Sequence, residues 1–299
     1  MSTTSTRNVS SHPPGTDARL NGIIDGFERG LPVFGTFAAP EPAAAIGLRD
    51  TDYDAVLFEA EHKPWDPPQL RDALQYLLDR REVRGAEGLA PATTPLVRVP
   101  PNGAELSQWH AKQALDLGAY GVVWPHIDTV EEARNAVAAC RYPGQEPADR
   151  GPAGLRGDSP AWAARYWGVP TAEYYRRADV WPLAPHGELL VGLMIESVRA
   201  VENLDEILRQ VAGVGFVMIG EGDLSQELSL PRQYDHPAVV KYKQRILDIC
   251  AGHGVAVAHP HVTAANVDEA VEQGYRLLFT APVVSHPGLA RGREITGRS

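Results

Sequence analysis

Cysteine is scarce in this sequence, which has two cysteines, Cys140 and Cys250, among 299 residues. They do not form the CxxC-type spacing of a metal site, and their apolar helical surroundings predict buried thiols in a reducing compartment. We therefore expect a cytoplasmic protein. Long apolar runs are also lacking, since none approaches the ~20 residues that a membrane-spanning helix needs. No membrane partner is expected.

The beginning of the sequence lacks a hydrophobic stretch, so we do not expect a signal peptide there. Residues 1–18 are polar and predict a disordered tail. The chain as a whole is 43% hydrophobic and 22% charged, which is an ordinary globular composition. A chain of this length and composition can bury a sizeable core.

Positive charge is in short supply, because 28 Lys and Arg residues face 38 Asp and Glu residues and the net charge is −10. A nucleic-acid partner is therefore not expected. An anionic substrate remains compatible with this charge, because one metal ion and one arginine can reverse the local field. The sequence also lacks an obvious basic cluster that could bind the phosphates of a nucleotide. An acyl-CoA, which carries such phosphates, is therefore a less favoured substrate than a small acid.

Eight short apolar runs alternate with segments whose apolar residues recur at helical spacing. The runs cover residues 31–37, 55–58, 94–99, 121–124, 189–195, 214–219, 255–258 and 277–280, and the helical segments cover residues 20–30, 41–48, 67–81, 106–118, 130–140, 201–208, 237–252 and 263–274. Eight such units in about 250 residues predict an α/β fold of the (β/α)8 barrel type. An open doubly wound sheet is the alternative, but no Gly-rich dinucleotide fingerprint follows the first strand. We predict a single barrel domain over residues 19–299, with a long inserted loop at about residues 142–188.

Two of the apolar runs stop abruptly at a carboxylate. Glu196 follows residues 189–195, and Asp223 follows residues 214–219 after a short Gly-Glu-Gly segment. The helical segment between the runs predicts parallel neighbouring strands, so both carboxylates should emerge at the same end of the sheet. Two hard oxygen ligands suit a divalent cation that keeps other positions for water or substrate. The alternative is that each carboxylate caps the next helix, although Glu is a poor N-cap.

Other predicted strands also end in chemically capable side chains, namely Glu59, Glu61, His62, Arg98, His126 and His259. The opposite ends carry mostly Gly, Pro and Ala. Because barrel enzymes carry their chemistry at the carboxyl ends of the strands, this asymmetry predicts a functional face. For His126, His259 and His261, a loop or capping role is the alternative. Arg98 alone could also serve in a structural ion pair.

The sequence resembles the HpcH/HpaI class II aldolases, relatives of the citrate lyase β-subunit that include enzymes of the 4-hydroxy-2-oxoheptanedioate aldolase type. The resemblance covers roughly residues 22–290. It is carried by residues 58–62 (FEAEH), 95–98 (PLVR), 118–125, 195–197 (IES) with 203–204 (NL), and 219–225 (IGEGDLS). Several motifs in the right order and spacing make it more specific than any one of them.

The resemblance implies a barrel enzyme that cleaves or forms a carbon–carbon bond between a 2-oxo acid, pyruvate, and an aldehyde. It implies a divalent metal ion, usually Mg²⁺, Mn²⁺ or Co²⁺, held at Glu196 and Asp223 and chelated by pyruvate. It further implies that Arg98 contacts the keto oxygen and that His62 belongs to the acid–base apparatus. A homo-oligomer, a trimer or a hexamer, is also implied. The residues expected to bind substrate are Arg98, Gly222, Glu221, Pro125 and His126.

The chemistry of these residues agrees with such a reaction. Retro-aldol cleavage places negative charge on the keto oxygen, which a metal ion and a guanidinium can stabilise. A proton must leave the substrate hydroxyl, and histidine is suited to accept it near neutral pH. The only lysine near a predicted strand end, Lys63, follows His62 in a loop, so an imine mechanism is disfavoured.

The sequence departs from the family pattern in two places. The familiar Asp-Gly-Glu-His segment is Glu59-Ala60-Glu61-His62 here, and we expect Glu59 to act as the catalytic partner of His62. The aromatic-rich residues 142–188 are unusual, and packing explains them better than a substrate pocket. Because this segment precedes the fifth strand, we expect that it can lie over the active face, where Arg156 would bind an anionic substrate end.

The leading prediction is therefore a metal-dependent 2-oxo acid aldolase. An oxaloacetate decarboxylase and an acyl-CoA lyase are alternatives within the enzymes. A barrel that binds 2-oxo acids without catalysis is the alternative outside them.

Overall fold

The computed structural model describes residues 18–49, 51–79, 88–145, 151–281 and 287–298. The predicted disordered tail, residues 1–18, lies outside these ranges except for Ala18, and the last two residues of the helix predicted at 67–81 lie outside them as well.

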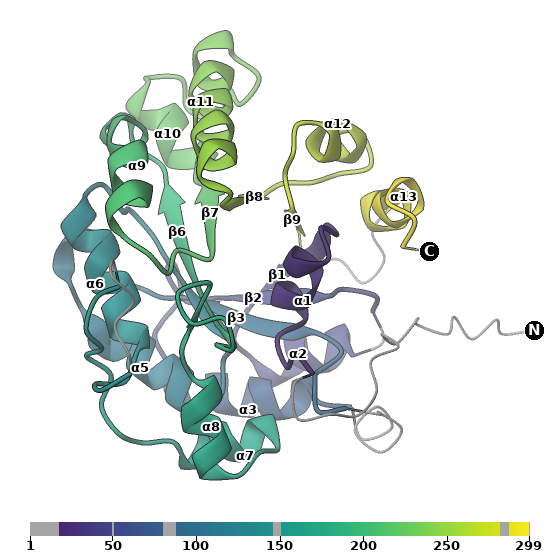
Figure 1. Ribbon diagram of the computed structural model, residues 1–299. Coiled ribbons are helices and arrows are strands. Elements are labelled where there is room, and N and C mark those ends of the chain that lie inside the picture. Colours follow the sequence, from purple (N-terminus) through teal and green to yellow (C-terminus); the bar gives the residue numbers. More distant parts are fainter. Residues whose placement is uncertain (1–17, 50, 80–87, 146–150, 282–286, 299) are drawn as a thin grey trace, which may run out of the picture.

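Eight parallel strands form a closed barrel (Figure 1). In chain order they are β1 (Val33–Ala38), β2 (Ala55–Glu59), β3 (Thr94–Arg98), β4 (Gly121–Trp124), β6 (Leu189–Ile195), β7 (Phe216–Ile219), β8 (Ala256–His259) and β9 (Leu277–Thr280). Each pairs with its neighbour, β9 pairs with β1, and the circle closes between β4 and β6, where Gly121 lies opposite Leu190. A two-residue strand, β5 (Val180–Trp181), adds to the beginning of β6. The predicted (β/α)8 barrel is confirmed.

Helices surround the barrel (Figure 1). They are α1 (Gly22–Glu28), α2 (Pro42–Leu48), α3 (Pro67–Leu77), α5 (Gln108–Asp116), α6 (Val130–Cys140), α7 (Ala161–Trp167), α8 (Thr171–Arg177), α9 (Val198–Gln210), α10 (Glu221–Glu227), α11 (Pro237–His253), α12 (Val267–Glu272) and α13 (Pro287–Ile295), with a 3-10 turn, η1 (Gly103–Glu105). Local sequence sets where several begin. Thr129 and Glu132 form a capping box at α6, and Ser197 caps α9.

The interior of the barrel is a packed core. Its buried side chains come from the strands, with Ile23 and Ile24 of α1 closing the end at which the strands begin. The strand members are Val33, Ala55, Leu57, Leu96, Val123, Leu190, Met194, Phe216, Met218, Ala258, Leu277 and Phe279. Gly35 and Gly192 leave room for phenyl rings. A Cβ at Gly35 would lie 2.6 Å from the ring of Phe279, and a Cβ at Gly192 would lie 2.4 Å from the ring of Phe216. A filled interior confines ligand chemistry to the ends of the barrel.

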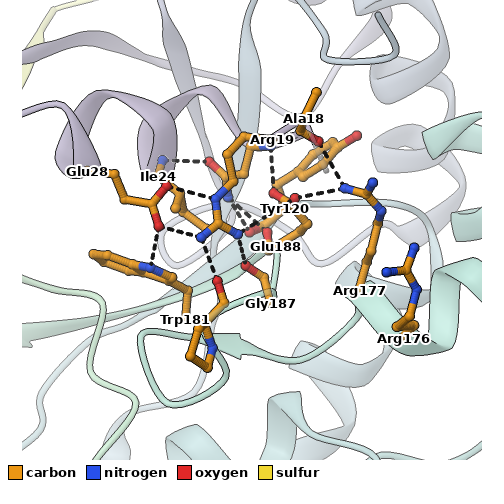
Figure 2. A network of polar contacts seen from close by, with 12 residues as sticks. Ala18, Arg19, Ile24, Glu28, Tyr120, Arg176, Arg177, Trp181, Gly187 and Glu188 are labelled. Atoms are coloured by element: carbon orange, nitrogen blue, oxygen red, sulfur yellow. Dashed lines mark hydrogen bonds and ion pairs between the residues drawn. The ribbon is translucent and has the colours of Figure 1, made fainter. Parts of the chain in front are cut away.

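A network of hydrogen bonds and ion pairs lies at the amino end of the barrel (Figure 2). The backbone N–H of Asn21 donates to Glu188 Oε2 at 2.9 Å, and Arg177 Nη1 lies 3.2 Å from Glu188 Oε1. Arg19 bonds the carbonyl of Gly187 at 3.0 Å and pairs with Glu28. Burial raises the pKa of Glu188, and the backbone N–H of Asn21 opposes that rise. This end of the barrel therefore has a structural role.

The described residues of the segment 142–188, residues 142–145 and 151–188, also lie toward this amino end, and the expectation that the segment can lie over the active face is wrong for them. Trp167 of α7 donates to the carbonyl of Gly118 at 3.0 Å and stacks on Tyr120 at 4.6 Å, just before β4 begins. The physical reason is connectivity: a segment between a helix and the next strand enters at the amino end of that strand. Most of its aromatic rings are buried, as the packing interpretation predicted.

Candidate active site

The carboxyl ends of β2, β3, β4, β6 and β7 bring most of the predicted residues together. Glu59 and Arg98 are paired in register as the last residues of β2 and β3. Glu196 directly follows β6, whose last residue lies opposite Ile219 of β7. Asp223 lies in the first turn of α10, which begins one residue after Gly220. The loop that contains Pro125 and His126 follows β4.

Glu196 is a buried carboxyl group with one firm hydrogen bond. It is 3% exposed, and its Oε1 accepts the backbone N–H of His126 at 2.6 Å. Burial raises its pKa to about 8, and the hydrogen bond from His126 only partly opposes this while nearby Glu61 adds to it. The capping alternative fails here, because Ser197 and not Glu196 caps α9. A buried carboxyl whose nearest ion-pair neighbour in the described residues is an imidazole, His126 Nδ1 at 3.5 Å, suits a metal ligand.

Three side chains could hold a metal ion together. His126, Glu196 and Asp223 each offer a ligand atom, and these atoms lie within 4.8 Å of one another. Gly220 makes this cluster sterically possible, because a Cβ there would lie 2.2 Å from Glu196 Oε2. One imidazole and two carboxylates form a donor set that fits a divalent cation, so the residues present agree with the metal that the resemblance implies.

Arg98 is held beside this cluster by two carboxylates. Its Nε lies 2.6 Å from Glu59 Oε2, its Nη2 pairs with the same oxygen, and its Nη1 lies 3.0 Å from Glu61 Oε2. The guanidinium also lies 3.6 Å from Met194 Sδ and over the ring of Phe37. With 14% of its side chain exposed, Arg98 is fixed in direction and partly shielded from water.

The contacts of His62 differ from the predicted dyad with Glu59. Glu59 Oε1 accepts the backbone N–H of His62 at 3.0 Å, while the carboxylate next to the ring is Glu61, with Oε2 at 3.6 Å from Nε2. The His62 side chain is 67% exposed, so its ring is open to a ligand. Burial raises the pKa of Glu61, against the opposing charge of Arg98. Among the described residues, Glu61 Oε2 has ion-pair neighbours but no partner in hydrogen-bond geometry.

Comparisons with known proteins agree with the geometry. A profile of the HpcH/HpaI aldolase/citrate lyase family matches residues 36–287. The chain belongs to this family. It is 36% identical over 201 residues to a 2-keto-3-deoxy-L-rhamnonate aldolase of Salmonella gallinarum, an alignment that covers 66% of this chain and 61% of that protein. With the protein of the same name from Salmonella schwarzengrund it shares 36% identity over 234 residues, which is 77% of this chain and 73% of that one.

The structural comparison extends over nearly the whole chain. An HpcH/HpaI aldolase/citrate lyase family protein from Burkholderia cenocepacia superposes with a TM-score of 0.71 at 26% identity, covering 92% of this chain and 97% of that one. The predicted family is confirmed, and with it the predicted enzyme class, a carbon–carbon lyase of the aldolase type. None of the helices in the described ranges is long and apolar enough to cross a membrane.

Of the expected substrate contacts in this HpcH/HpaI member, Gly222 has an open environment. A Cβ at Gly222 would meet nothing within 4 Å, so there is open space beside its Cα. The Glu221 carboxylate is already engaged, with Lys243 Nζ at 2.9 Å and His261 Nδ1 at 2.7 Å. Burial raises the pKa of Glu221, but His261 and Lys243 outweigh it and lower the value to about 2. Lys243 lies in the middle of α11, and no signal in the sequence singles it out.

Arg156 is not brought to this site. Its guanidinium is buried, and its Nη2 lies 2.9 Å from Asp116 Oδ1 and 2.7 Å from the Tyr174 hydroxyl. His259 is a core residue whose Nδ1 accepts the backbone N–H of His261 at 3.1 Å. Burial lowers the pKa of His259 to about 4.

Proposed function

We propose that the protein is a divalent-metal-dependent aldolase that cleaves or forms a carbon–carbon bond between pyruvate and an aldehyde. The observation that carries this proposal is the buried Glu196 beside Asp223 and His126, with the Arg98 guanidinium held next to it. The names of the Salmonella relatives suggest 2-keto-3-deoxy sugar acids as the first substrates to test.

Glu196 and Asp223 would hold the cation, with Mg²⁺, Mn²⁺ and Co²⁺ as candidates. When bound, the ion would supply positive charge where the keto oxygen becomes negative. Arg98 would donate to the same oxygen. Because Glu59 and Glu61 already fix its guanidinium, little reorganisation is needed as charge develops.

His62 would move the proton of the substrate hydroxyl. Its exposed ring can reach a ligand, and Glu61 at 3.6 Å can stabilise the imidazolium that forms. Glu59 would act through the backbone of His62 and through Arg98, which makes it a positioning residue. Gly222 and Pro125 would contact the substrate at the mouth of the barrel. The lysine of α11, Lys243, is paired with Glu221, so the metal-dependent route is favoured over an imine.

The proposal extends to location and assembly. Both cysteines are free and buried, which agrees with a cytoplasmic protein. Trp109 and Trp162 are about half exposed, at 49% and 47%, which agrees with a homo-oligomer. Light scattering coupled to size-exclusion chromatography should give the mass of a trimer or a hexamer.

The function is tested with metal-free protein supplied with each divalent cation in turn. A 2-keto-3-deoxy sugar acid, a 4-hydroxy-2-oxo acid, oxaloacetate and an acyl-CoA are offered separately, and pyruvate release from the first two is coupled to lactate dehydrogenase. We expect metal-dependent cleavage of a hydroxy-oxo acid, abolished in Asp223→Ala without loss of the folded state. Turnover of oxaloacetate alone would identify a decarboxylase, and turnover of none would favour a non-catalytic binding barrel.

A further inference from the structure

His126 has an uncommon backbone conformation. Its φ is 52°, in the left-handed region that only a few per cent of non-glycine residues adopt, among which Asn, Asp and His are the most frequent. Strained backbone of this kind persists where the surroundings hold it in place and is frequent at ligand sites.

Three hydrogen bonds fix the loop around it. The backbone N–H of His126 donates to Glu196 Oε1 at 2.6 Å, that of Ile127 donates to the Met194 carbonyl at 3.2 Å, and that of Gly103 donates to the Pro125 carbonyl at 3.1 Å. Gly103 is also packed against the loop, because a Cβ there would lie 2.7 Å from the His126 carbonyl oxygen. The conformation of residues 125–127 is therefore tied to β6 and η1 from both sides.

This conformation directs the imidazole at the carboxylates. Nδ1 lies 3.5 Å from Glu196 Oε1, and Nε2 lies 3.8 Å from Glu61 Oε1. A ring nitrogen is within 4.8 Å of the oxygens of both Glu196 and Asp223. Donor atoms around one ion, each about 2.2 Å from it, lie at most about 4.4 Å apart, so these three groups need little or no movement to share a cation.

We propose that His126 is a third protein ligand of the metal site and makes it a mixed nitrogen–oxygen site. The proposal rests on the proposed metal dependence and adds to it a consequence for metal choice. Mg²⁺ prefers oxygen donors only, whereas an imidazole strengthens binding of Co²⁺ and of later transition metals. His126 therefore biases this chain toward a transition-metal ion, and its place at the end of β4 is explained by coordination, not by contact with substrate.

The first measurement uses wild-type protein loaded with Mn²⁺. Pulsed electron paramagnetic resonance detects a nitrogen nucleus bound to the ion, and we expect a ¹⁴N signal that His126→Gly abolishes. Glycine is the replacement of choice because it adopts the left-handed conformation freely, and His126→Asn, which tolerates it, is the second variant. His253→Gln is the matched control, since His253 pairs with Asp205 between α11 and α9. It should leave the ¹⁴N signal unchanged.

The second measurement compares dissociation constants for Co²⁺ and Mg²⁺ by calorimetry. We expect the Co²⁺ constant of His126→Gly to rise by at least about 10-fold and the Mg²⁺ constant to rise less. A purely structural role would weaken both ions equally, and that result would overturn the proposal. Wild-type protein that binds Mn²⁺ through Asp223 without a ¹⁴N signal would also overturn it while leaving the proposed function intact. A wild-type protein that binds no divalent ion would refute the metal-dependent function itself.

Discussion

Gly220→Ala offers the sharpest test of the site, because the three atoms nearest to the new methyl group all belong to Glu196. The new Cβ would lie 2.2 Å from Glu196 Oε2 and 2.3 Å from Glu196 Cβ. An ordinary carbon contact begins at about 3.4 Å, so the Glu196 side chain or the start of α10 must shift by roughly 1 Å. Either shift breaks the 2.6 Å bond between His126 N–H and Glu196 Oε1 or separates Glu196 from Asp223.

The cost of this substitution follows from overpacking and misplacement. Forcing a methyl group into a packed site costs about 1–3 kcal/mol of unfolding free energy. A displacement of about 1 Å at a catalytic constellation costs on the order of 100-fold in kcat. We therefore expect Gly220→Ala to unfold at lower denaturant, to bind metal weakly and to lose most of its aldolase activity.

Gly222→Ala, two residues away, is the matched control. Its Cβ would meet nothing within 4 Å, and Ala in a helix is favoured over Gly by about 0.5–1 kcal/mol. Metal affinity should therefore be unchanged and stability equal or slightly higher, measured by calorimetry and by urea unfolding. If the two variants bind metal equally well, the packing of Gly220 against Glu196 does not support the site and the reasoning is refuted.

Three other outcomes test the roles of single residues. Arg98→Lys should lose nearly as much kcat as Arg98→Ala, because an ammonium cannot bridge Glu59 and the keto oxygen as a planar guanidinium can; a normal kcat with only a raised KM would contradict this. His62→Ala should slow aldol cleavage by roughly 10²–10⁴ and oxaloacetate decarboxylation much less, since only the first reaction removes a hydroxyl proton; equal losses would move the acid–base role elsewhere. In the metal-free protein the pKa of Glu196 is raised from 4.5 to about 8, so between these pH values the folded state binds one proton more than the unfolded state. The free energy of unfolding therefore falls as the pH rises from 4.5 to about 8, by on the order of 5 kcal/mol. Glu196→Gln should remove this part of the fall in urea-unfolding curves measured from pH 5 to 9, and an unchanged slope would show that Glu196 is ionised in the fold.

The barrel and the end at which polar side chains collect could be predicted because both follow from short-range patterns. Apolar runs that end in Glu196 or Arg98 define the strands and the end where polar groups collect, and parallel pairing then places them together. The helix that begins at Glu221 could not be predicted, because the glycines on either side of Glu221 weaken the helical signal.

Side-chain partners could not be predicted in the same way. Proximity in sequence predicts that Glu59 contacts the ring of His62, three residues away, whereas the Glu59 carboxylate pairs with Arg98 on the neighbouring strand, 39 residues away. The register between β2 and β3 determines the partner of Glu59, and the local sequence does not specify that register. Arg156 differs from Glu59 in this respect, because it lies between α6 and β6 and this connectivity places it at the amino end of the barrel, away from the predicted site.

The closure of the amino end of the barrel by Ile23 and Ile24 has a consequence for the kinetics of the reaction. In the part of the chain that the structure describes, the filled interior leaves no passage through the barrel, so substrate and products share one mouth. In the proposed reaction, a pyruvate held against Glu196 and Arg98 would lie beneath the aldehyde fragment to which it was joined. The aldehyde would then leave first and pyruvate second, so we expect ordered release. Pyruvate should inhibit cleavage competitively, while the aldehyde should inhibit it non-competitively.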